Sequence, residues 1–318
     1  MMEKPEVLVV WPNRPEQMKQ LGETYHLHRL DQAADPEALL QQVAPRIRAV
    51  VTSHGGGLKQ SLVDRLPNLE IVASSGVGID TLCIDACHAR GIPVTHTPGV
   101  LTEDVADMGM LLLLATVRRL VQGERWVRDG HWQSKGMMPL NTAIRGKKLG
   151  IVGFGRIGKA VALRAEAFGL DISYYGRRPQ LGITYPYYSD LTDLARDVDI
   201  LLLALPGGDE TRGLIDGAVL QALGPSGYLI NVARGSVVEE PALVTALQQG
   251  TIAGAGLDVF VDEPRVPAAL LDMENVVLQP HCSSGTVETR GAMAQLVVDN
   301  LAAHFAGRAL LTPVARSA

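Results

Sequence analysis

The chain has 318 residues, 47% of them hydrophobic and 20% charged, which is typical of a folded protein of about two domains. A net charge of −5 argues against a nucleic-acid partner, and no apolar run reaches the roughly 20 residues that cross a bilayer. The three cysteines do not have the spacing of metal ligands, so we expect no metal site. The N-terminal residues contain no apolar core of a signal peptide, and we therefore expect a cytoplasmic chain.

Short β-branched runs alternate with helical stretches through the first hundred residues. Strands are predicted at Val7–Val10, Ala49–Thr52, Ile71–Ala73 and Pro93–His96. Helices are predicted at Asp35–Val43, Ser61–Leu66 and Asp80–Arg90. Because strands that alternate with helices through short connections form parallel sheets, we expect a parallel sheet flanked by helices.

The pattern changes near Pro98, after which a long apolar helix is predicted from Leu101 to Arg119. The next segment, Gly123–Arg145, holds two tryptophans and two methionines with little periodicity, so we expect an irregular arm. Aromatic and methionine residues on such an arm are typical of an oligomer interface. An ordinary packed loop explains them equally well.

The alternation of strands and helices resumes at Leu149. Strands are predicted at Leu149–Gly153, Asp171–Tyr175, Ile200–Leu205, Tyr228–Asn231, Gly254–Asp258 and Val276–Gln279. One long helix is predicted over Thr286–Ala306. The two α/β systems, one before Pro98 and one after Arg145, therefore predict two domains.

A glycine motif lies between the strand at Leu149 and the helix that follows it. Gly153, Gly155 and Gly158 form GxGxxG. In this context the three glycines allow the tight turn, the close approach of a pyrophosphate and the packing of the helix on the strand. The phosphates would then bind N–H groups at the helix N-terminus. The motif therefore predicts a dinucleotide site.

The end of the next strand indicates which dinucleotide is bound. NAD enzymes usually place an acid there, whereas this chain reads Gly176-Arg177-Arg178. A carboxylate would repel a 2′-phosphate, and an arginine hydrogen-bonds it with charge assistance. We therefore predict NADP, as NADPH, over NADH. The alternative is that Arg177 and Arg178 are ordinary solvated surface residues.

Ionisable residues follow three of the later predicted strands. They are Arg234, His281 and one of the adjacent acids Asp262 and Glu263, between which spacing does not choose. Because the carboxyl ends of parallel strands share one edge of a sheet, these side chains should converge. A protonated histidine beside a carboxylate can protonate the oxygen of a 2-keto acid as hydride reaches its carbon, and an arginine can stabilise the developing charge.

Backbone N–H groups in Ser74–Gly78 could form a nest for the substrate carboxylate. Taken singly, each candidate side chain has an ordinary structural interpretation, such as a surface ion pair. Together, three strand-end positions behind a dinucleotide motif favour an enzyme of 2-keto acid chemistry. Two roles stay open for His54, namely contact with a substrate hydroxyl or exposure to solvent.

A likeness that covers nearly the whole chain rests on five motifs between Val72 and Arg290: VASSGVGID, VGFGRIG, NVARGSVVEE, GAGLDVF with the following EP, and QPHCSSGTVETR. Their combination resembles the signatures of the D-isomer-specific 2-hydroxyacid dehydrogenases. The resemblance implies Arg234, Glu263 and His281 as the catalytic residues, which selects Glu263 over Asp262. Many members of that family carry a small apolar residue or glycine where this chain has Cys282 and Ser283.

The resemblance also implies the binding residues and the fold. Substrate contacts would come from Ser75, Gly76, Val77, Gly78 and Arg234. Cofactor contacts would come from Gly153, Gly155, Arg156, Ile157, Gly158, Gly176, Arg177, Arg178, Leu205, Pro206, Val232, Asp258, His281 and Ser284. The implied fold is α/β with two Rossmann-like doubly wound parallel sheets. A discontinuous substrate domain (1–98 plus 286–318) would flank a dinucleotide-binding domain (99–285), and the helical arm after residue 100 would form a homodimer interface.

Within the family, the arginine run and the compact length are most similar to NADPH-dependent glyoxylate/hydroxypyruvate reductases and to their 2-ketogluconate-reducing relatives. The main hypothesis is therefore an NADPH-dependent reductase of small 2-keto acids that forms D-2-hydroxy acids. A second hypothesis is a dinucleotide-sensing corepressor that binds peptides on the same fold.

Overall fold

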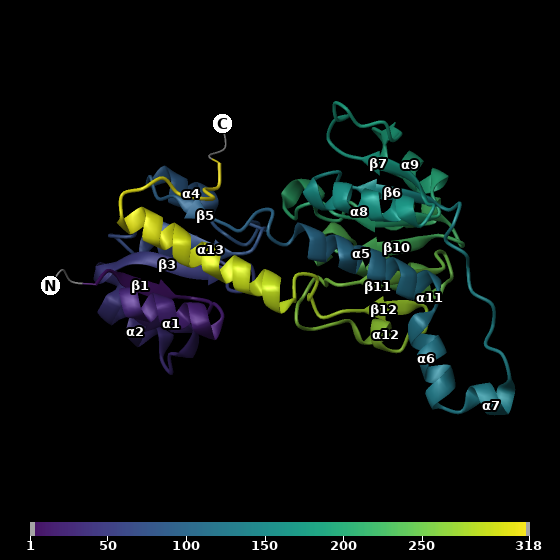
Figure 1. Ribbon diagram of the computed structural model, residues 1–318, viewed down its shortest axis with the longest axis horizontal. Helices are drawn as coiled ribbons and strands as arrows, with labels where there is room; N and C mark the ends of the chain where they lie inside the picture. Colours follow the sequence, from purple (N-terminus) through teal and green to yellow (C-terminus); the bar gives the residue numbers. More distant parts are fainter. Residues whose placement is uncertain (1–3, 316–318) are drawn as a thin grey trace. The chain divides into compact units, whose positions relative to one another are not determined.

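The computed structural model describes residues 4–315, which divide into two compact units. The first unit contains the described residues up to Leu101 together with those from Ser284 onward, and the second runs from Thr102 to Ser283 (Figure 1). Both units are α/β, as expected. The assignment of these units as a substrate domain and a dinucleotide-binding domain stays a prediction.

A five-stranded parallel sheet in the order β2–β1–β3–β4–β5 forms the centre of the first unit. Its strands are β1 (Glu6–Val9), β2 (His26–Arg29), β3 (Ile47–Ser53), β4 (Ile71–Ser75) and β5 (Val94–Thr95). Its helices are α1 (Pro15–Thr24), α2 (Pro36–Val43), α3 (Gln60–Asp64), α4 (Ile84–Ala89) and α13 (Val287–Phe305), with short 3-10 turns at Leu30–Gln32 and Ala44–Arg46.

Alternate residues of these strands face two separate cores, because successive side chains of a strand point to opposite faces. On one face Val7, Ile71 and their neighbours pack against α1 and α13. On the other face Leu8, Val72 and their neighbours pack against α2, α3 and α4. Burial on both faces explains why the strands read as continuous apolar runs.

The segment 310–314, which we name the C-terminal segment, lies along β5. The Val314 N–H donates to Val94 O (2.7 Å), and Pro313 bridges Thr95 in antiparallel fashion. The buried Asn300 of α13 holds the same segment, because its side-chain oxygen accepts from the N–H groups of Leu311 and Thr312. The C-terminal segment therefore extends the edge of the first sheet.

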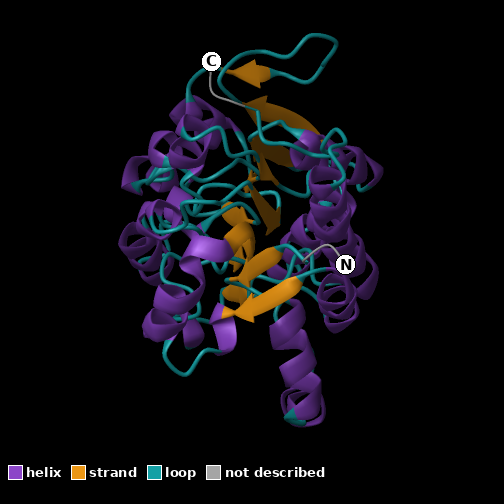
Figure 2. Ribbon diagram, turned by 90° about the vertical axis from the view of Figure 1, so that its left-hand side faces the viewer, coloured by secondary structure: helices purple, strands orange, loops and turns teal. Residues whose placement is uncertain are grey.

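A seven-stranded parallel sheet in the order β12–β11–β10–β9–β6–β7–β8 forms the centre of the second unit. Its strands are β6 (Lys148–Val152), β7 (Asp171–Tyr175), β8 (Tyr187–Tyr188), β9 (Ile200–Leu203), β10 (Tyr228–Asn231), β11 (Gly254–Leu257) and β12 (Val276–Leu278). Its main helices are α5 (Thr102–Val117), α8 (Arg156–Ala167), α9 (Leu191–Asp197), α10 (Gly217–Leu223), α11 (Glu240–Gln248) and α12 (Ala268–Leu271), with 3-10 turns at Asp209–Thr211 and Gly235–Val237. Figure 2 shows helices on both sides of the strands.

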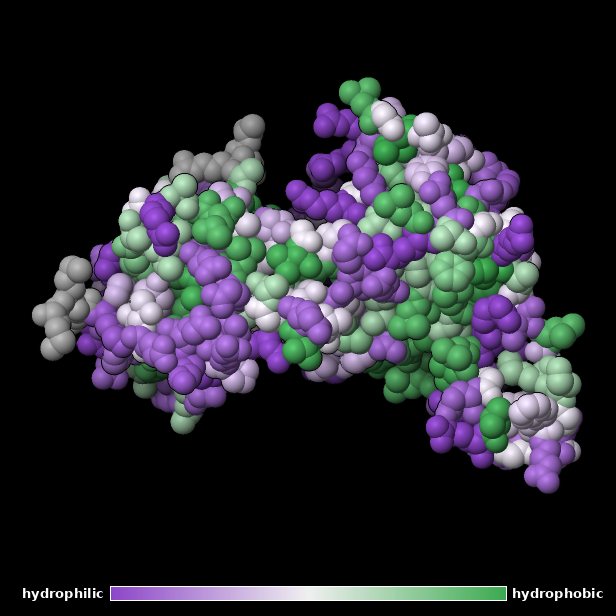
Figure 3. Space-filling model, in the orientation of Figure 1, coloured by the Kyte–Doolittle hydropathy of each residue, from purple (hydrophilic) through white to green (hydrophobic). Residues whose placement is uncertain are grey.

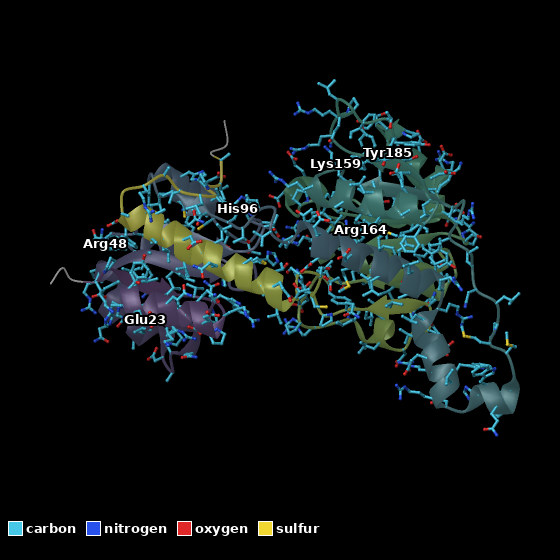
Figure 4. All side chains as sticks on the ribbon, in the orientation of Figure 1. Glu23, Arg48, His96, Lys159, Arg164 and Tyr185 are labelled. Carbon is cyan, nitrogen blue, oxygen red and sulfur yellow. The ribbon has the colours of Figure 1, made fainter. Side chains whose placement is uncertain are left out.

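Helices α5 and α8 pack together on one face of this sheet. The backbone of α5 approaches the sheet closely at Gly109, where an added Cβ would lie 3.4 Å from the Leu202 side chain. At the solvent side, Arg164 of α8 donates to Asp107 (2.6 Å) and to Glu103 (2.8 Å) of α5 (Figure 4). These contacts fix α8, whose N-terminus carries the glycine motif.

The arm after α5 corrects the expectation of an irregular segment over residues 123–145. Two helices form there, α6 (Leu120–Arg128) and α7 (His131–Lys135), and residues 136–145 are non-helical. Neither helix buries a side chain, yet α6 is strongly amphipathic, so an apolar stripe at helical spacing was present in the sequence and was missed. Figure 3 shows apolar residues at the surface of this arm.

Three further elements carried no clear sequence signal, namely α1, β2 and β8. Helix α1 contains few apolar residues, and β2 and β8 are short strands at the sheet edges. The long helix predicted from residue 286 forms as α13. No helix within residues 4–315 has both the length and the apolarity that spanning a membrane requires.

Candidate active site

The turn between β6 and α8 depends on two glycines that no other residue could replace without a clash. Gly153 has a φ of +93°, and an added Cβ would lie 2.8 Å from Ala204 O and 2.7 Å from the Leu205 Cβ. At Gly158 an added Cβ would lie 2.3 Å from Gly153 O. The turn and the close packing of α8 on β6 therefore have the geometry that the motif predicts.

Gly155 between them differs, because an added Cβ would meet no atom within 4 Å. It is the N-cap of α8, and no side chain caps the N–H groups of the first turn, where Arg156 and Ile157 lie. An open backbone at an uncapped helix N-terminus binds phosphate through free N–H groups and the helix dipole. These residues fit the pyrophosphate of a dinucleotide.

The end of β7 presents an open glycine followed by two exposed arginines. Gly176 has open space at its Cβ position, and its carbonyl accepts a hydrogen bond from the Tyr187 hydroxyl (3.1 Å). The Arg177 side chain is 91% exposed, and its Nη1 lies 4.0 Å from Glu210 Oε2. Sequence analysis did not identify Glu210, which comes from the loop after β9. This exposed pair is weak, so it leaves the guanidinium able to bind an anion.

Arg234 follows β10 on a backbone that buried contacts hold in place. The Asn231 side-chain N–H donates to Arg234 O (2.9 Å), and its side-chain oxygen accepts from the Ala233 N–H (3.0 Å). At Gly235 an added Cβ would lie 1.9 Å from the Phe260 carbonyl carbon. The segment of Arg234 is therefore packed directly against the segment that leads to Glu263.

His281 and Glu263 form the central pair of the candidate site. The two side chains are 33% and 32% exposed, and His281 Nδ1 lies 2.6 Å from Glu263 Oε2. The other carboxylate oxygen of Glu263 accepts from the Phe260 N–H (3.0 Å). The carboxylate is therefore fixed at both oxygens, and it orients the imidazole through Nδ1.

Asp258, at the end of β11, has a structural role that the sequence did not reveal. Its side chain is buried, with 1% exposed, and its carboxylate accepts from the N–H groups of Cys282 (2.8 Å) and Ser283 (3.0 Å) and from the Ser283 hydroxyl. The His281 N–H donates to Asp258 O (2.8 Å). These bonds hold His281 in a left-handed conformation with φ +50°. The backbone N–H groups of Cys282 and Ser283, together with the Ser283 hydroxyl, therefore anchor the histidine loop.

The two adjacent acids have different partners. Asp262 accepts two hydrogen bonds from Arg265, at 2.7 and 2.8 Å, while Glu263 faces His281. The hydrogen bonds from Arg265 lower the pKa of Asp262 below its ordinary value. The structure thus separates the two candidates that spacing could not, and it brings Glu263 to the histidine.

Val232 lies buried directly after β10, and Leu205 and Pro206 follow β9, where Leu205 packs on Gly153. These residues surround the same strand ends as the glycine turn. Ser284 is the first residue of the second segment of the first unit. The cofactor contacts suggested for these residues stay predictions.

The expected carboxylate-binding residues Ser75–Gly78 belong to the first unit, at the carboxyl end of β4. Gly76 is buried, and Val77 and Gly78 are partly buried. His54, in the loop after β3, has its Nδ1 3.7 Å from Asp80 Oδ1, and its carbonyl accepts from the Thr81 hydroxyl (2.9 Å). His54 is therefore in a defined contact and not simply extended into solvent.

Comparison with known proteins agrees with this geometry. The model for the NAD-binding domain of D-isomer-specific 2-hydroxyacid dehydrogenases matches residues 110–283. A glyoxylate/hydroxypyruvate reductase A of Arabidopsis thaliana is 48% identical over 98% of this chain and 100% of its own length. A 2-ketogluconate reductase of Gluconobacter oxydans is 43% identical over 99% of this chain and 100% of its own length.

A solved structure extends this agreement to the whole fold. The NADPH-dependent glyoxylate/hydroxypyruvate reductase of Sinorhizobium meliloti, crystallised with NADP and malonate, is 46% identical, with a TM-score of 0.93 over 99% of this chain and 100% of that one. The family assignment rests on these full-length matches. The glycine turn after β6 and the histidine–glutamate pair agree with it. The chain is an oxidoreductase that belongs to the D-isomer-specific 2-hydroxyacid dehydrogenase family.

Proposed function

We propose that this chain is an NADPH-dependent reductase of small 2-keto acids, with glyoxylate and hydroxypyruvate as the main substrates and D-2-hydroxy acids as products. The observation that carries the proposal is the 2.6 Å contact between His281 and Glu263, in the unit that also contains Arg234. The names of the Arabidopsis and Sinorhizobium relatives support the substrate class.

The proposed reaction assigns one task to each residue. The bound dinucleotide supplies the hydride that reaches the carbonyl carbon. Protonated His281 donates the proton from Nε2 to the carbonyl oxygen, since Nδ1 is bonded to Glu263. Arg234 orients the keto acid and stabilises the charge that develops on its oxygen. The Val77 and Gly78 N–H groups bind the substrate carboxylate.

The experiment that tests the proposal measures steady-state rates with NADPH and NADH on glyoxylate, hydroxypyruvate, pyruvate and 2-ketogluconate. We expect the highest kcat/KM on glyoxylate or hydroxypyruvate with NADPH. A clear preference for 2-ketogluconate would show that the chain is a 2-ketogluconate reductase instead, which is the activity in the name of the Gluconobacter relative. No turnover with any of these substrates would refute the proposed reductase activity.

The preference for NADPH rests on the end of β7. The chain has Arg177 and Arg178 there, both exposed, and an open glycine before them. The Sinorhizobium enzyme that binds NADP supports the same assignment. Hydrogen bonds between arginine and phosphate contribute about 1.5–3 kcal/mol each, which corresponds to a tenfold or larger change in affinity.

Replacing Arg177 and Arg178 with alanine should therefore raise the KM for NADPH about tenfold or more and leave the KM for NADH nearly unchanged. Arg196→Ala is the matched control, because this exposed arginine of α9 pairs with Asp193. If NADPH affinity is unchanged in the double variant, the arginines do not bind the 2′-phosphate.

We also propose that the arm of α6 and α7 binds a second copy of this chain. The arm exposes Val127, Trp132, Met137 and Leu140 around a hollow of about 590 Å³. Exposed apolar area of this kind marks a binding surface. Sedimentation should detect a homodimer, which Val127→Glu with Leu140→Glu converts to a monomer, whereas the exposed Leu181→Glu leaves it intact. A monomeric wild-type chain would contradict this proposal.

A further inference from the structure

Thr97 lies two residues after β5 and is fully buried. Its side-chain Oγ1 accepts from the Gly76 N–H (3.0 Å), and its own N–H donates to Gly76 O (2.8 Å). One residue thus satisfies both backbone groups of the glycine at which the chain leaves β4. No catalytic motif contains Thr97, and nothing in the proposed reaction uses it.

The residue before Thr97 contacts the next position of the same loop. His96 Nδ1 lies 3.2 Å from Val77 O (Figure 4 labels His96). The backbone of His96 is itself held by the C-terminal segment. The Thr312 hydroxyl donates to His96 O (2.6 Å), and the His96 N–H donates to Thr312 O (3.2 Å). The loop after β4 is thus supported by a strand end that α13 and the C-terminal segment fix.

These contacts determine which backbone groups of the loop are turned inward. The N–H and carbonyl of Gly76 and the carbonyl of Val77 all bind residues 96 and 97. Within residues 4–315, no backbone carbonyl accepts from the N–H group of Val77 or of Gly78, and both residues are partly exposed. Two successive N–H groups that face outward form a nest for an anion.

We propose that Thr97 is a positioning residue for substrate binding, because it fixes the loop whose Val77 and Gly78 N–H groups receive the carboxylate of the keto acid. This inference rests on the proposed function and adds to it a residue that sets affinity for the acid. Removing the Oγ1 acceptor would leave a buried Gly76 N–H unsatisfied, and the loop would shift to hydrate it. The keto acid, and not the dinucleotide, would then lose its contacts.

The test compares Thr97→Val, which replaces the hydroxyl with a methyl group of similar size, with Thr97→Ser, which keeps the hydroxyl. We expect Thr97→Val to raise the KM for glyoxylate about tenfold, with kcat and the KM for NADPH within about twofold of wild type. Thr97→Ser should restore most of the loss. Thr95→Val is the matched control, because Thr95 is buried at the end of β5, two residues before Thr97, and its hydroxyl makes a long contact (3.5 Å) to Val72 O.

A second readout measures carboxylate binding without turnover. Oxalate is titrated against the enzyme saturated with NADPH, and its dissociation constant should rise in Thr97→Val in proportion to the KM for glyoxylate. If Thr97→Val fails to fold, Thr97→Ala takes its place in both measurements.

Three results would overturn the inference: an unchanged KM for glyoxylate, a loss confined to kcat, or an equal effect of Thr95→Val. Absence of turnover in the wild-type enzyme would instead refute the proposed function. The two failures are therefore distinguishable, because the first requires an active wild-type reductase.

Discussion

The loop after β11 shows how two neighbouring acids acquire different roles. Asp262 and Glu263 are adjacent in sequence, yet one pairs with exposed Arg265 and the other with His281. Exposed ion pairs contribute little to stability. A carboxylate that orients a proton donor, in contrast, affects each turnover. The two residues therefore form a natural pair of matched variants.

We predict that Glu263→Gln reduces kcat about 10²-fold or more and alters the pH dependence of kcat/KM, since the imidazole loses the negative charge beside Nδ1. Asp262→Asn should leave kcat within about twofold of wild type. Steady-state kinetics over a pH series checks both variants. Comparable losses in the two would mean that the loop as a whole, rather than the contact with His281, supports catalysis.

At the residue scale, the sequence predicted candidate residues but not their contacts. Arg234, His281 and the two adjacent acids could be proposed because each follows an apolar strand. The choice between Asp262 and Glu263 could not be made from spacing, since it depends on the path of a loop. The loop-anchoring role of Asp258 was also missed, because it depends on contacts with Cys282 and Ser283.

At the scale of the element, the glycines of the turn between β6 and α8 make separable contributions. Gly158 packs its backbone against Gly153 O, whereas Gly155 faces open space at its Cβ position. The first is required for the fold of the turn. The second is required only where a phosphate must approach the backbone.

Gly158→Ala should therefore destabilise the chain by about 1–3 kcal/mol, because its Cβ would overlap the carbonyl oxygen. Gly155→Ala should unfold at the wild-type temperature, since the φ of −81° at this position suits alanine. It should bind NADPH more weakly, because the added Cβ would occupy the open space that a phosphate needs. Thermal unfolding and NADPH fluorescence titration measure the two effects. A wild-type affinity in Gly155→Ala would mean that the pyrophosphate does not approach this glycine.

The bounds of some strands were predicted to the residue, whereas some helices were not predicted at all. The bounds of β7 and β10 are those expected, because each is rich in strand-forming apolar or aromatic residues and lies next to a glycine. Helices α1 and α6 were not predicted although both are amphipathic, so the spacing of their apolar residues was a signal that was missed. α1 buries only Gln17 and Leu21 and α6 buries none of its side chains, so neither contains the long apolar run that marks α5.

At the scale of the whole molecule, Glu70 joins separate parts of the first unit. It accepts hydrogen bonds from Arg48 of β3 (2.5 and 3.0 Å), and His304 of α13 lies 3.3 Å away. The Arg48 hydrogen bond, assisted by His304 and opposed by partial burial, lowers the pKa of Glu70 below its ordinary value of 4.5. The unfolded chain therefore binds a proton at Glu70 at a higher pH than the folded chain does.

The stabilisation from Glu70 is thus complete above about pH 4.5 and is lost as pH falls through the lower folded pKa. We expect Glu70→Gln to lose less stability than wild type between about pH 5 and pH 3. Urea unfolding at a series of pH values measures the slope, with exposed Glu23→Gln of α1 as the control. Equal slopes in wild type and Glu70→Gln would contradict the linkage.

The discontinuity of the first unit has a consequence during synthesis on the ribosome. Val297 and Leu301 of α13 complete the core that also contains Val7 and Ile71. They are translated only after all of residues 102–283. The second unit, being contiguous, can bury its own core first, while one apolar face of the nascent N-terminal sheet is covered only in part, by α1. That face is where a chaperone would be needed until translation reaches α13.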